Sequence, residues 1–380
     1  MQNFFKILRT LDKILGSFFV LSFLVFSKVL YGKLSPFKKS STKVKSILVI
    51  RLWALGESIL TLPMISVLKN NNFLKVDVLV SRRNKEVFES VDFVDDVLLI
   101  SDFKRLLSNL RNYDLVIDTE PYFFFSAVLA KFLGKKVVGF AGLFRDKLYD
   151  FKVKYKDDCH AVLNFCNLLS PLNIHFFPEK LISIRYTNED KVKVNELLNS
   201  FNLTNGRLIG IHCGTAETAP WRGWKKQKFA ELISKVAKMG YFVILTGGKR
   251  EYLLNEEVIS LINEEKIKNK VFNFAGKTNL RELAYLLTNF EVFISNDTGP
   301  MHLSAAMGTK TIGLFGPNLP ERFAPFGKGN VAIYKASNLN CSPCINVHKG
   351  EFRSCKFNGK CMDLIEVEDV YKAFLQLIKK

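Results

Sequence analysis

Short apolar runs alternate with helical stretches along most of the chain that follows residue 45. Because these runs are continuously apolar, they indicate parallel strands that are buried on both faces by helices. In the first half, strands are predicted at Ser46–Leu52, Val76–Val80, Val97–Ile100, Leu115–Ile117 and Val137–Phe140, with an apolar helix through Leu60–Leu68. This half therefore predicts a doubly wound α/β domain.

The second half of the chain repeats this scheme. Its strands are predicted at Leu208–His212, Phe242–Thr246, Val271–Phe274, Val292–Ser295 and Thr311–Phe315. The helix Leu280–Phe290 carries an apolar stripe, and Asn279 and Glu282 form a capping box at its start. An earlier helix, Glu189–Phe201, ends in the polar turn Asn202–Arg207, which indicates a domain boundary.

These patterns predict two Rossmann-like domains, at residues 44–200 and 206–335. A cysteine-rich tail at residues 336–380 follows, and its last helix, Val367–Ile378, is expected to pack back. Ligands of doubly wound sheets bind beyond the carboxyl ends of the strands. A cleft between the two domains is therefore the expected active site.

The first 40 residues have a different pattern. Residues 14–27 contain no charge and are flanked by Lys13 and Lys28. A membrane-spanning helix needs about 20 apolar residues, so the run spans a bilayer only if Lys28 snorkels. The alternatives are a signal peptide and a helix buried against the globular body. The basic residues on both sides favour a membrane-associating segment at residues 1–40, on an anionic surface.

Composition narrows the class of partner. With 380 residues and 48% hydrophobic content, the chain is long enough for two cores. The formal net charge of +19 favours anionic partners such as phosphate-bearing substrates and acidic lipids. Because no stacking motif and no helix-turn-helix pattern is present, we predict no nucleic-acid partner.

The strongest chemical signal lies in Ile294–Asn318. A predicted strand ends in a polar turn, Pro300 stands at a favoured first helical position, and a small-residue helix runs from Met301 to Met307, with Gly308 placed to end it. Free N–H groups and the helix dipole at such a start form a seat for a diphosphate. The alternative is an ordinary capped turn. The predicted donor-binding residues here are Asp297, Thr298, Gly299, Met301 and His302.

A carboxylate stands at a second predicted strand-to-helix turn, within Arg51–Pro63. Gly56 allows a tight turn, and Glu57 follows at the helix start, with Ser58 next in the same loop. A carboxylate placed there can act as the general base that removes a proton from an acceptor hydroxyl. The alternative is that Glu57 only stabilises the helix N-terminus.

Three further loops follow predicted strands. In the first, small residues and hydroxyls such as Thr215 suit a phosphate, and Arg222 supplies a cation; His212 before it is either structural or catalytic. In the second, Gly247 and Gly248 allow close approach of a ligand, and Glu251 is either a ribose ligand or a solvated acid. In the third, Lys277 and Thr278 border the predicted nucleotide site.

The segment Asp297–Gly308 (DTGPMHLSAAMG), followed by a strand and by GPN, resembles the signature of glycosyltransferase family 9. The resemblance extends over about residues 46–370 as an ordered series of motifs. It implies a GT-B fold with two facing Rossmann-like doubly wound domains, the first binding the acceptor and the second the nucleotide-sugar donor. The N-terminal hydrophobic helix is not part of it.

The resemblance also implies residue roles. The family carries an Asp as the proposed base where this chain has Glu57, and a Lys where this chain has Arg222. Glu251 matches the family's acidic ribose ligand. The implied reaction is inverting transfer of heptose from ADP-heptose onto a lipid-linked lipopolysaccharide core, with no cofactor required for catalysis, at the cytoplasmic face of the bacterial inner membrane. The two departures support an alternative, a degenerate transferase that binds nucleotide sugar without turnover.

Four cysteines form a separate cluster in the tail. Cys341, Cys344, Cys355 and Cys361 have the spacing C-x2-C-x10-C-x5-C, which suits tetrahedral zinc. An iron–sulfur centre, two disulfides and free thiols are the alternatives. Because the cluster lies far in sequence from the phosphate motifs, we expect a structural zinc site and not a catalytic metal.

Overall fold

The computed structural model describes residues 10–18, 20–22, 44–71, 73–204, 206–217 and 219–379. Much of the predicted membrane-associating segment at residues 1–40, namely residues 1–9, 19 and 23–40, lies outside the described residues. The chain forms two compact units. The first unit comprises Met1–Ala54, Thr61–Pro178 and Val347–Gly350; the second comprises Leu55–Leu60, Glu179–Asn346 and Glu351–Lys380.

The break between the units follows Pro178, earlier than the polar turn at Asn202–Arg207 that the sequence suggests. The helix α7 (Asn188–Ser200) accounts for the difference. Its buried residues Val194 and Leu198 lie on the side that packs against α11 (Leu280–Thr288) of the second unit. The polar turn therefore connects two elements of the same unit.

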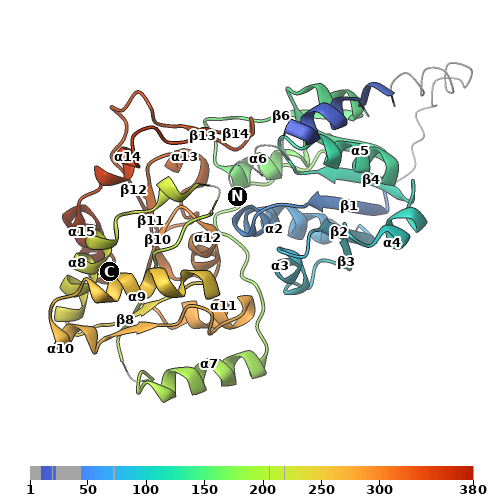
Figure 1. Cartoon of the computed structure of the whole chain (residues 1–380). Helices are drawn as coiled ribbons and strands as arrows, with labels where there is room; N and C mark the ends of the chain where they lie inside the picture. The colour runs from blue at the N-terminus through green and yellow to red at the C-terminus, as the bar shows by residue number, and fades with distance from the viewer. Residues whose placement is uncertain are drawn as a thin grey trace, which may run out of the picture. The chain divides into compact units, whose positions relative to one another are not determined.

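The first unit contains a six-stranded, fully parallel sheet with the order β3-β2-β1-β4-β5-β6 (Figure 1). Its strands are β1 (Ser46–Arg51), β2 (Lys75–Val80), β3 (Asp96–Leu99), β4 (Tyr113–Asp118), β5 (Gly134–Ala141) and β6 (Phe151–Lys154). The positions of the first five confirm the sequence prediction. The edge strand β6 was not predicted, because its Phe-Lys-Val-Lys sequence is half polar.

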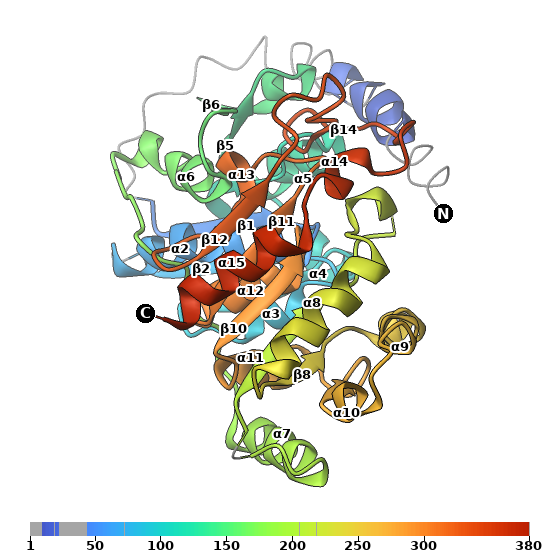
Figure 2. The ribbon, with the colours of Figure 1, turned by 90° about the vertical axis from the view of Figure 1, so that its left-hand side faces the viewer.

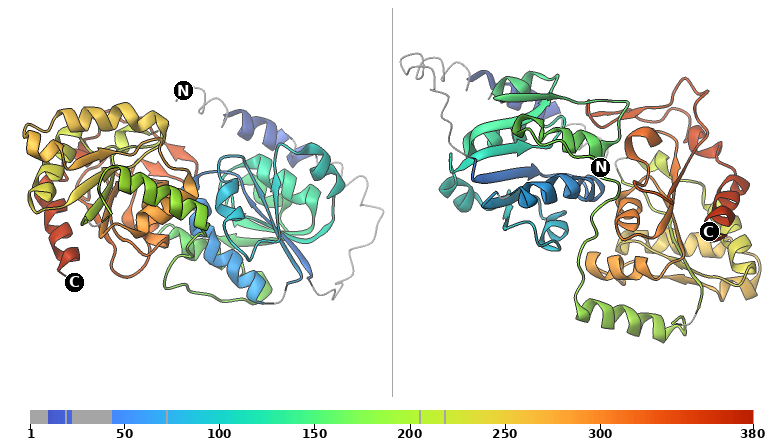
Figure 3. Two further views of the ribbon diagram at one scale, coloured as in Figure 1. Left: turned by 90° about the horizontal axis from the view of Figure 1, so that it is seen from below. Right: turned by 180° about the vertical axis from the view of Figure 1, so that it is seen from behind.

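Helices cover this sheet on both faces. They are α2 (Leu55–Asn70), α3 (Lys85–Glu89), α4 (Phe103–Ser108), α5 (Phe124–Leu133) and α6 (Ala161–Asn167), with 3-10 turns η1 (Phe144–Leu148) and η2 (Ser170–Leu172). The helix α2 begins five residues before the predicted Leu60 start. A further helix at residues 10–18 and 20–22, here called the N-terminal helix, lies beside α5 (Figure 3).

The second unit contains a sheet with the order β12-β11-β10-β7-β8-β9, again fully parallel. Its strands are β7 (Leu208–His212), β8 (Phe242–Leu245), β9 (Val271–Asn273), β10 (Val292–Asn296), β11 (Lys310–Phe315) and β12 (Val331–Tyr334). All but β12 were predicted. Counted in chain order within each unit, the two sheets have the same strand order, the order of Rossmann folds.

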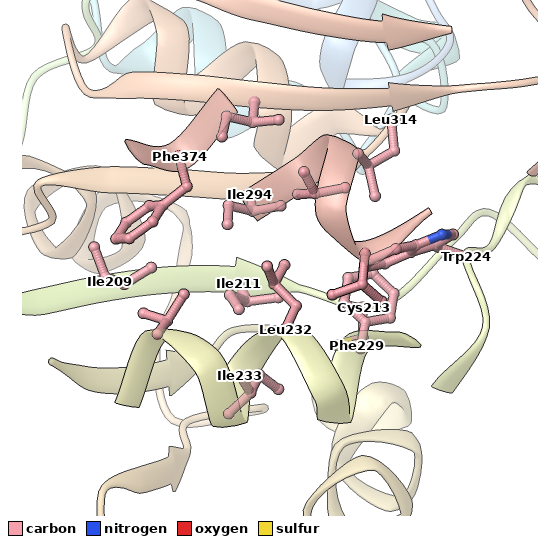
Figure 4. Packing of buried hydrophobic residues seen from close by; sticks show 14 of the residues in the cluster. Ile209, Ile211, Cys213, Trp224, Phe229, Leu232, Ile233, Ile294, Leu314 and Phe374 are labelled. Atoms are coloured by element: carbon pink, nitrogen blue, oxygen red, sulfur yellow. The ribbon is translucent and has the colours of Figure 1, made fainter. Parts of the chain in front are cut away.

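The core of the second unit lies between its sheet and two helices. Ile209 and Ile211 of β7 face Leu232 and Ile233 of α8 (Lys226–Lys238), while Phe374 of α15 fills the adjacent space (Figure 4). The last helix, α15 (Val367–Ile378), has the predicted bounds and lies beside α8 (Figure 2). The cysteine-rich tail therefore returns the chain to the core of the second unit.

The remaining elements of the second unit are short. They are η3 (Pro220–Arg222), η4 (Lys249–Glu251), α9 (Tyr252–Ser260), α10 (Glu265–Lys268), α12 (Gly299–Ala306), α13 (Pro320–Phe323), α14 (Lys360–Asp363) and the hairpin strands β13 (Ile345–Asn346) and β14 (Glu351–Phe352). The capping box of Asn279 and Glu282 is present. Gly308 ends α12 with a φ of +83°, as its position predicts.

Candidate active site

The candidate donor site lies where the strand order of the second unit reverses, between β7 and β10. Asn296, the last residue of β10, bridges this point: its Nδ2 donates to the carbonyl oxygens of Cys213 and Gly214 at 3.0 and 3.1 Å, and its Oδ1 accepts from Trp224 N at 3.1 Å. Asn296 is fully buried. It therefore fixes the loop after β7 and the start of the Trp224 segment against the end of β10.

Arg222 and Asp297 meet at this edge. Arg222 Nη2 lies 2.6 Å from Asp297 Oδ2, and Asn318 Nδ2 donates to the same oxygen at 3.0 Å. The side chains of Arg222 and Asp297 are 15% and 7% exposed. A buried charge pair of this kind stays stable only while both partners are present. The sequence predicted both residues as donor ligands, and the structure brings them together.

The start of α12 is not capped by the side chain of its own N-cap residue. Thr298 is the N-cap residue, but its hydroxyl donates to Asn296 O at 3.2 Å and contacts Ser295 Oγ at 3.1 Å instead of the helix N–H groups. The carboxylate of Asp297 points to Arg222 and Asn318. Neither Thr298 nor Asp297 therefore caps the helix N–H groups with its side chain. The dipole of a helix start favours an anion.

The turn that carries Glu57 packs against this helix start. A Cβ on Gly56 would lie 2.6 Å from His302 Cδ2, and a Cβ on Gly299 would lie 2.9 Å from Leu55 Cδ2. Both glycines are therefore needed for the close approach of Leu55–Leu60 to α12, and these residues belong to the same compact unit. Glu57, half-buried in the first turn of α2, follows Gly56 directly.

The strand end that leads to Glu57 is held by a buried carboxylate. Glu120 Oε1 accepts from Leu52 N at 2.6 Å and from Trp53 N at 3.0 Å, and lies 3.6 Å from Arg51 Nε. Burial raises the pKa of Glu120, although Arg51 lowers it. The next residue, Ala54, has a φ of +65°, a conformation that costs of order 1–3 kcal/mol. The hydrogen bonds of Glu120 therefore fix Leu52 and Trp53, the two residues that precede Ala54.

A second buried ion pair lies beside it in the first unit. Asp118 Oδ2 accepts from Arg145 Nη1 at 3.1 Å, from Tyr149 Oη at 2.7 Å and from Ser126 Oγ at 2.8 Å. Both charged side chains are fully buried. Because the carboxylate is bonded by protein groups, this pair is structural.

The loops after β7 and β8 meet around Glu251. A Cβ on Gly214 would lie 2.8 Å from Glu251 Cγ, and one on Gly247 would lie 2.6 Å from Glu251 Cβ. One carboxylate oxygen, Oε2, accepts from Gly248 N at 2.7 Å in a capping box. Gly276, which precedes the Lys277–Thr278 pair, donates its N–H to Gly247 O at 2.8 Å.

Burial lowers the pKa of His212 to about 4. The ring is therefore neutral at neutral pH and is not an imidazolium that could act as a general acid. Its burial, with 6% of the residue exposed, favours the structural interpretation of His212.

Three other predicted site residues differ in how exposed their side chains are. Thr215 is half-exposed and lies beside Gly223 of the Arg222 loop. The side chain of Met301 is fully buried against Gly313, so only its backbone can face a ligand. Ser58 is also fully buried, which does not favour its predicted contact with an acceptor.

The four tail cysteines are free thiols in the structure. Cys355 Sγ accepts from Phe357 N at 3.4 Å and from Gly359 N at 3.2 Å. Burial raises the pKa of Cys361 to about 12, and the neighbouring thiols Cys344, Cys355 and Cys341 add to this rise. Within the described ranges, no three His, Cys, Asp or Glu side chains form a group that could hold a metal ion.

The family model of glycosyltransferase family 9 (heptosyltransferase) matches residues 102–351. The chain belongs to this family. It is therefore a glycosyltransferase, and its two Rossmann-like units are those of the predicted GT-B fold.

Known relatives agree with this assignment. The chain is 28% identical over 316 residues to lipooligosaccharide heptosyltransferase 2 of Campylobacter jejuni serotype O:2, covering 78% of this chain and 91% of the relative. Among solved structures, it is similar to a family 9 glycosyltransferase from Veillonella parvula, with a TM-score of 0.73, 22% identity and coverage of 88% and 97%. ADP-heptose lps heptosyltransferase II of Escherichia coli gives a TM-score of 0.69 at 20% identity, with coverage of 88% and 98%.

Three positioning residues of this glycosyltransferase were missed by sequence reasoning. Asn296 and Asn318 fall inside the Ile294–Asn318 segment but were not singled out. Glu120 follows the predicted strand at Leu115–Ile117, and an acid just beyond a parallel strand was a usable signal. What no pattern shows is that these side chains bond to loops far away in sequence.

Proposed function

We propose that this enzyme transfers heptose from ADP-heptose onto a lipid-linked lipopolysaccharide core. The observation that carries the proposal is that the Gly56–Glu57 turn packs on the start of α12, which its N-cap residue Thr298 does not cap with its side chain. A carboxylate and an anion seat thus lie within one compact unit. The names of the relatives, which are lipooligosaccharide and lipopolysaccharide heptosyltransferases, support this donor and this acceptor.

In the proposed reaction, Glu57 removes the proton of the acceptor hydroxyl. The hydroxyl oxygen attacks the anomeric carbon while the bond from that carbon to the diphosphate oxygen breaks on the opposite face, which inverts the configuration. The electron pair of this bond leaves with ADP. Glu57 ends protonated and returns its proton to water.

The leaving diphosphate gains negative charge on one oxygen as the bond breaks. Arg222 and the N–H groups at the start of α12 stabilise this charge, with the hydroxyls of Thr215 and Thr298 beside them. Asp297 holds Arg222 and orients the sugar, and Glu251 binds the ribose hydroxyls through its second carboxylate oxygen. Thr278 and the backbone around His302 border the donor.

Catalysis by these groups needs no metal ion. We expect transfer to continue in the presence of EDTA, because the cation that faces the diphosphate is Arg222. Complete loss of activity in EDTA that is restored by a divalent cation would contradict this.

For the tail, we propose a structural zinc ion held by Cys341, Cys344, Cys355 and Cys361. Their spacing and the two N–H groups directed at Cys355 Sγ support it, because such bonds stabilise a thiolate ligand. The four thiols must draw together when zinc binds, because among the described residues no three of them form a group that could hold a metal ion. Elemental analysis of the purified chain should give about one zinc per chain, lost in Cys355→Ser and retained in Cys159→Ser. Iron in place of zinc, or no metal in either protein, would overturn the assignment.

The test of the reaction is release of nucleoside diphosphate, followed by mass spectrometry with a panel of nucleotide sugars. Acceptor-dependent ADP release from ADP-heptose is expected, together with loss of about 10²–10⁴-fold in kcat in Glu57→Gln. ADP-heptose binding should be retained in that variant. Glu57→Asp, which restores the family's residue, should keep more activity than Glu57→Gln. Binding of ADP-heptose without release in the native enzyme would favour the degenerate transferase instead.

We further propose that the reaction takes place at the cytoplasmic face of the inner membrane. Nucleotide-sugar donors are made in the cytoplasm, and the proposed acceptor is lipid-linked. Among the residues that the structure describes, none of the helices is both long and apolar enough to cross a bilayer. Fractionation of cells with an antibody to the chain should recover it with inner membranes.

A further inference from the structure

The N-terminal helix docks on the first unit through an unusual face. Asp12 accepts from the N–H groups of Phe124 and Phe125 at 3.0 Å each, Gly16 lies against Phe124 and Val20 is fully buried in the core. These three positions are four residues apart and form one stripe of the helix. A Cβ on Gly16 would come within 2.2 Å of Phe124 Cβ, so only glycine allows this contact.

The opposite face of the same helix is apolar and open to solvent. Ile14 is 60% exposed and Phe18 is 65% exposed. Among the described residues of this helix, the exposed set of large apolar side chains is Leu11, Ile14, Leu15, Phe18 and Leu21. A helix on a water-soluble surface normally buries its large apolar residues and exposes its polar ones. Here the acid and the glycine are turned inward and the large apolar side chains outward.

This apolar face is continued by α5. Phe125 and Phe132 of α5 are each about half-exposed, and they stand seven residues apart on one side of that helix. Phe125 is also one of the two residues whose N–H group bonds to Asp12. We call the exposed set of the N-terminal helix together with Phe125 and Phe132 the apolar face. A contiguous exposed face of this kind marks an interaction site.

The charge of the N-terminal region indicates which kind of partner covers the apolar face. Residues 1–45 contain nine Lys or Arg and a single acidic residue, Asp12. That acid is directed into the first unit, where it caps α5. Lys13 on the N-terminal helix and Lys136 at the start of β5 are exposed. In sequence, the N-terminal helix is therefore flanked by basic residues on both sides, which fits an anionic partner with an apolar interior.

We propose that the apolar face lies in the interface of an anionic phospholipid bilayer, with the N-terminal helix parallel to the membrane plane. This rests on the proposed function in one respect: a lipid-linked acceptor explains why the first unit would be held at a membrane. The bonds of Asp12 and the contact of Gly16 make the helix a rigid part of that unit. The membrane thus sets the orientation of the unit instead of tethering it by a flexible arm.

The test is co-sedimentation of the full chain with phosphatidylglycerol vesicles. Ile14→Glu/Phe18→Glu should lower the partition coefficient at least about tenfold, because two apolar side chains lose their burial and negative charge is added. Phe125→Glu/Phe132→Glu should lower it as well. The matched control is Leu74→Glu/Leu253→Glu, whose two leucines are each 71% exposed elsewhere. Phosphatidylcholine vesicles should bind the native chain more weakly.

Unchanged vesicle binding of both double variants would overturn the proposal. So would a native chain that sediments as a dimer without vesicles and becomes monomeric in Ile14→Glu/Phe18→Glu, since the face would then bind a second copy. Turnover on a delipidated core oligosaccharide separates this proposal from the proposed function: the variants should keep it. If the native chain has no turnover on any acceptor but the variants lose vesicle binding, the function fails and the membrane surface stands.

Discussion

The two units share one strand order, and in each a helix follows the fourth strand. In the first unit this helix is α5, and in the second it is α12. The N–H groups at the start of α5 are bonded to the carboxylate of Asp12, a residue of the chain itself. At the start of α12, the N-cap residue Thr298 makes no cap with its own side chain. One fold thus offers the same kind of helix start twice; the first binds a carboxylate of the chain itself, and we propose that the second binds the diphosphate of the donor.

The charged groups near the starts of α5 and α12 also differ in how far they are buried and bonded. In the first unit, Asp118 and Arg145 are fully buried and bonded to protein groups, and Glu120 is bonded to the backbone of the β1 loop. In the second unit, Arg222 keeps some exposure and pairs with Asp297 next to the start of α12. Buried and bonded charges fix geometry, and we propose that the partly exposed cation of the second unit instead binds the diphosphate.

Of the substitutions proposed here, Arg222→Ala should have the largest effect on stability and on ADP binding. It removes the cation of the second seat and leaves Asp297 buried with only Asn318, which costs about 3–5 kcal/mol of stability. Arg222→Lys restores the family's residue and should lose much less stability and donor affinity. Calorimetric titration with ADP and thermal unfolding measure the two effects. Equal ADP affinity in Arg222→Ala and the native chain would show that the seat lies elsewhere.

Asn296→Ala tests how strongly Asn296 fixes the loops of the candidate donor site in the second unit. The substitution removes three hydrogen bonds that join β10 to the β7 loop and to Trp224, at about 1 kcal/mol each. We expect the free energy of unfolding to fall by about 2–3 kcal/mol and ADP binding to weaken. Asn289→Ala, which removes a bond to Tyr285 O within one helix, is the control. Urea unfolding of both variants gives the comparison.

The neutral histidine of the second unit predicts a pH dependence. Because the pKa of His212 is about 4 when folded and near 6.5 when unfolded, the unfolded chain binds more protons between these values. Its contribution to stability is thus complete above pH 6.5 and is lost as the pH falls toward 4. Between pH 7.5 and 5, the loss is about 2 kcal/mol.

The measurement uses urea unfolding in a Trp53→Phe background. The remaining tryptophans, Trp221 and Trp224, then both report on the second unit. His212→Asn should flatten the pH dependence between pH 7.5 and 5. A variant with the same slope as its parent would show that other groups cause the change.

Asp12→Ala should have the smallest effect. It leaves the two N–H groups at the start of α5 without their carboxylate partner, at a cost of about 1 kcal/mol, typical of a lost helix cap. Because this also removes a contact of the N-terminal helix, trypsin should cleave after Lys13 faster than in the native chain. Thr10→Ala, an exposed position on the same helix, is the control for cleavage. Unchanged cleavage in Asp12→Ala would show that Gly16 and Val20 alone hold the helix.

Several features of this protein could be read from the sequence. Continuous apolar runs predicted the strands from Ser46 and from Leu208 almost to the residue, because strands buried on both faces need uninterrupted apolar side chains. Local signals predicted the capping box of Asn279 and the end of α12 at Gly308, since both depend on neighbouring residues. Asp297 was found for the same reason, as a polar residue just after a predicted strand, whereas Arg222 was found as the cation of the loop after Leu208–His212, at the position of the family's Lys.

Other features were decided only by the tertiary structure. The bonds from Asn296 to Gly214, from Glu120 to Leu52 and from Asp12 to Phe124 join residues 68 to 112 positions apart. Nothing in the local pattern of any of these residues names its partner. The inward direction of Asp12 and Gly16, with Ile14 and Phe18 outward, also contradicts what a helical pattern alone suggests. Sequence periodicity records which face of an element differs from the others, but the surface that packs against that face is set by chain segments distant in sequence.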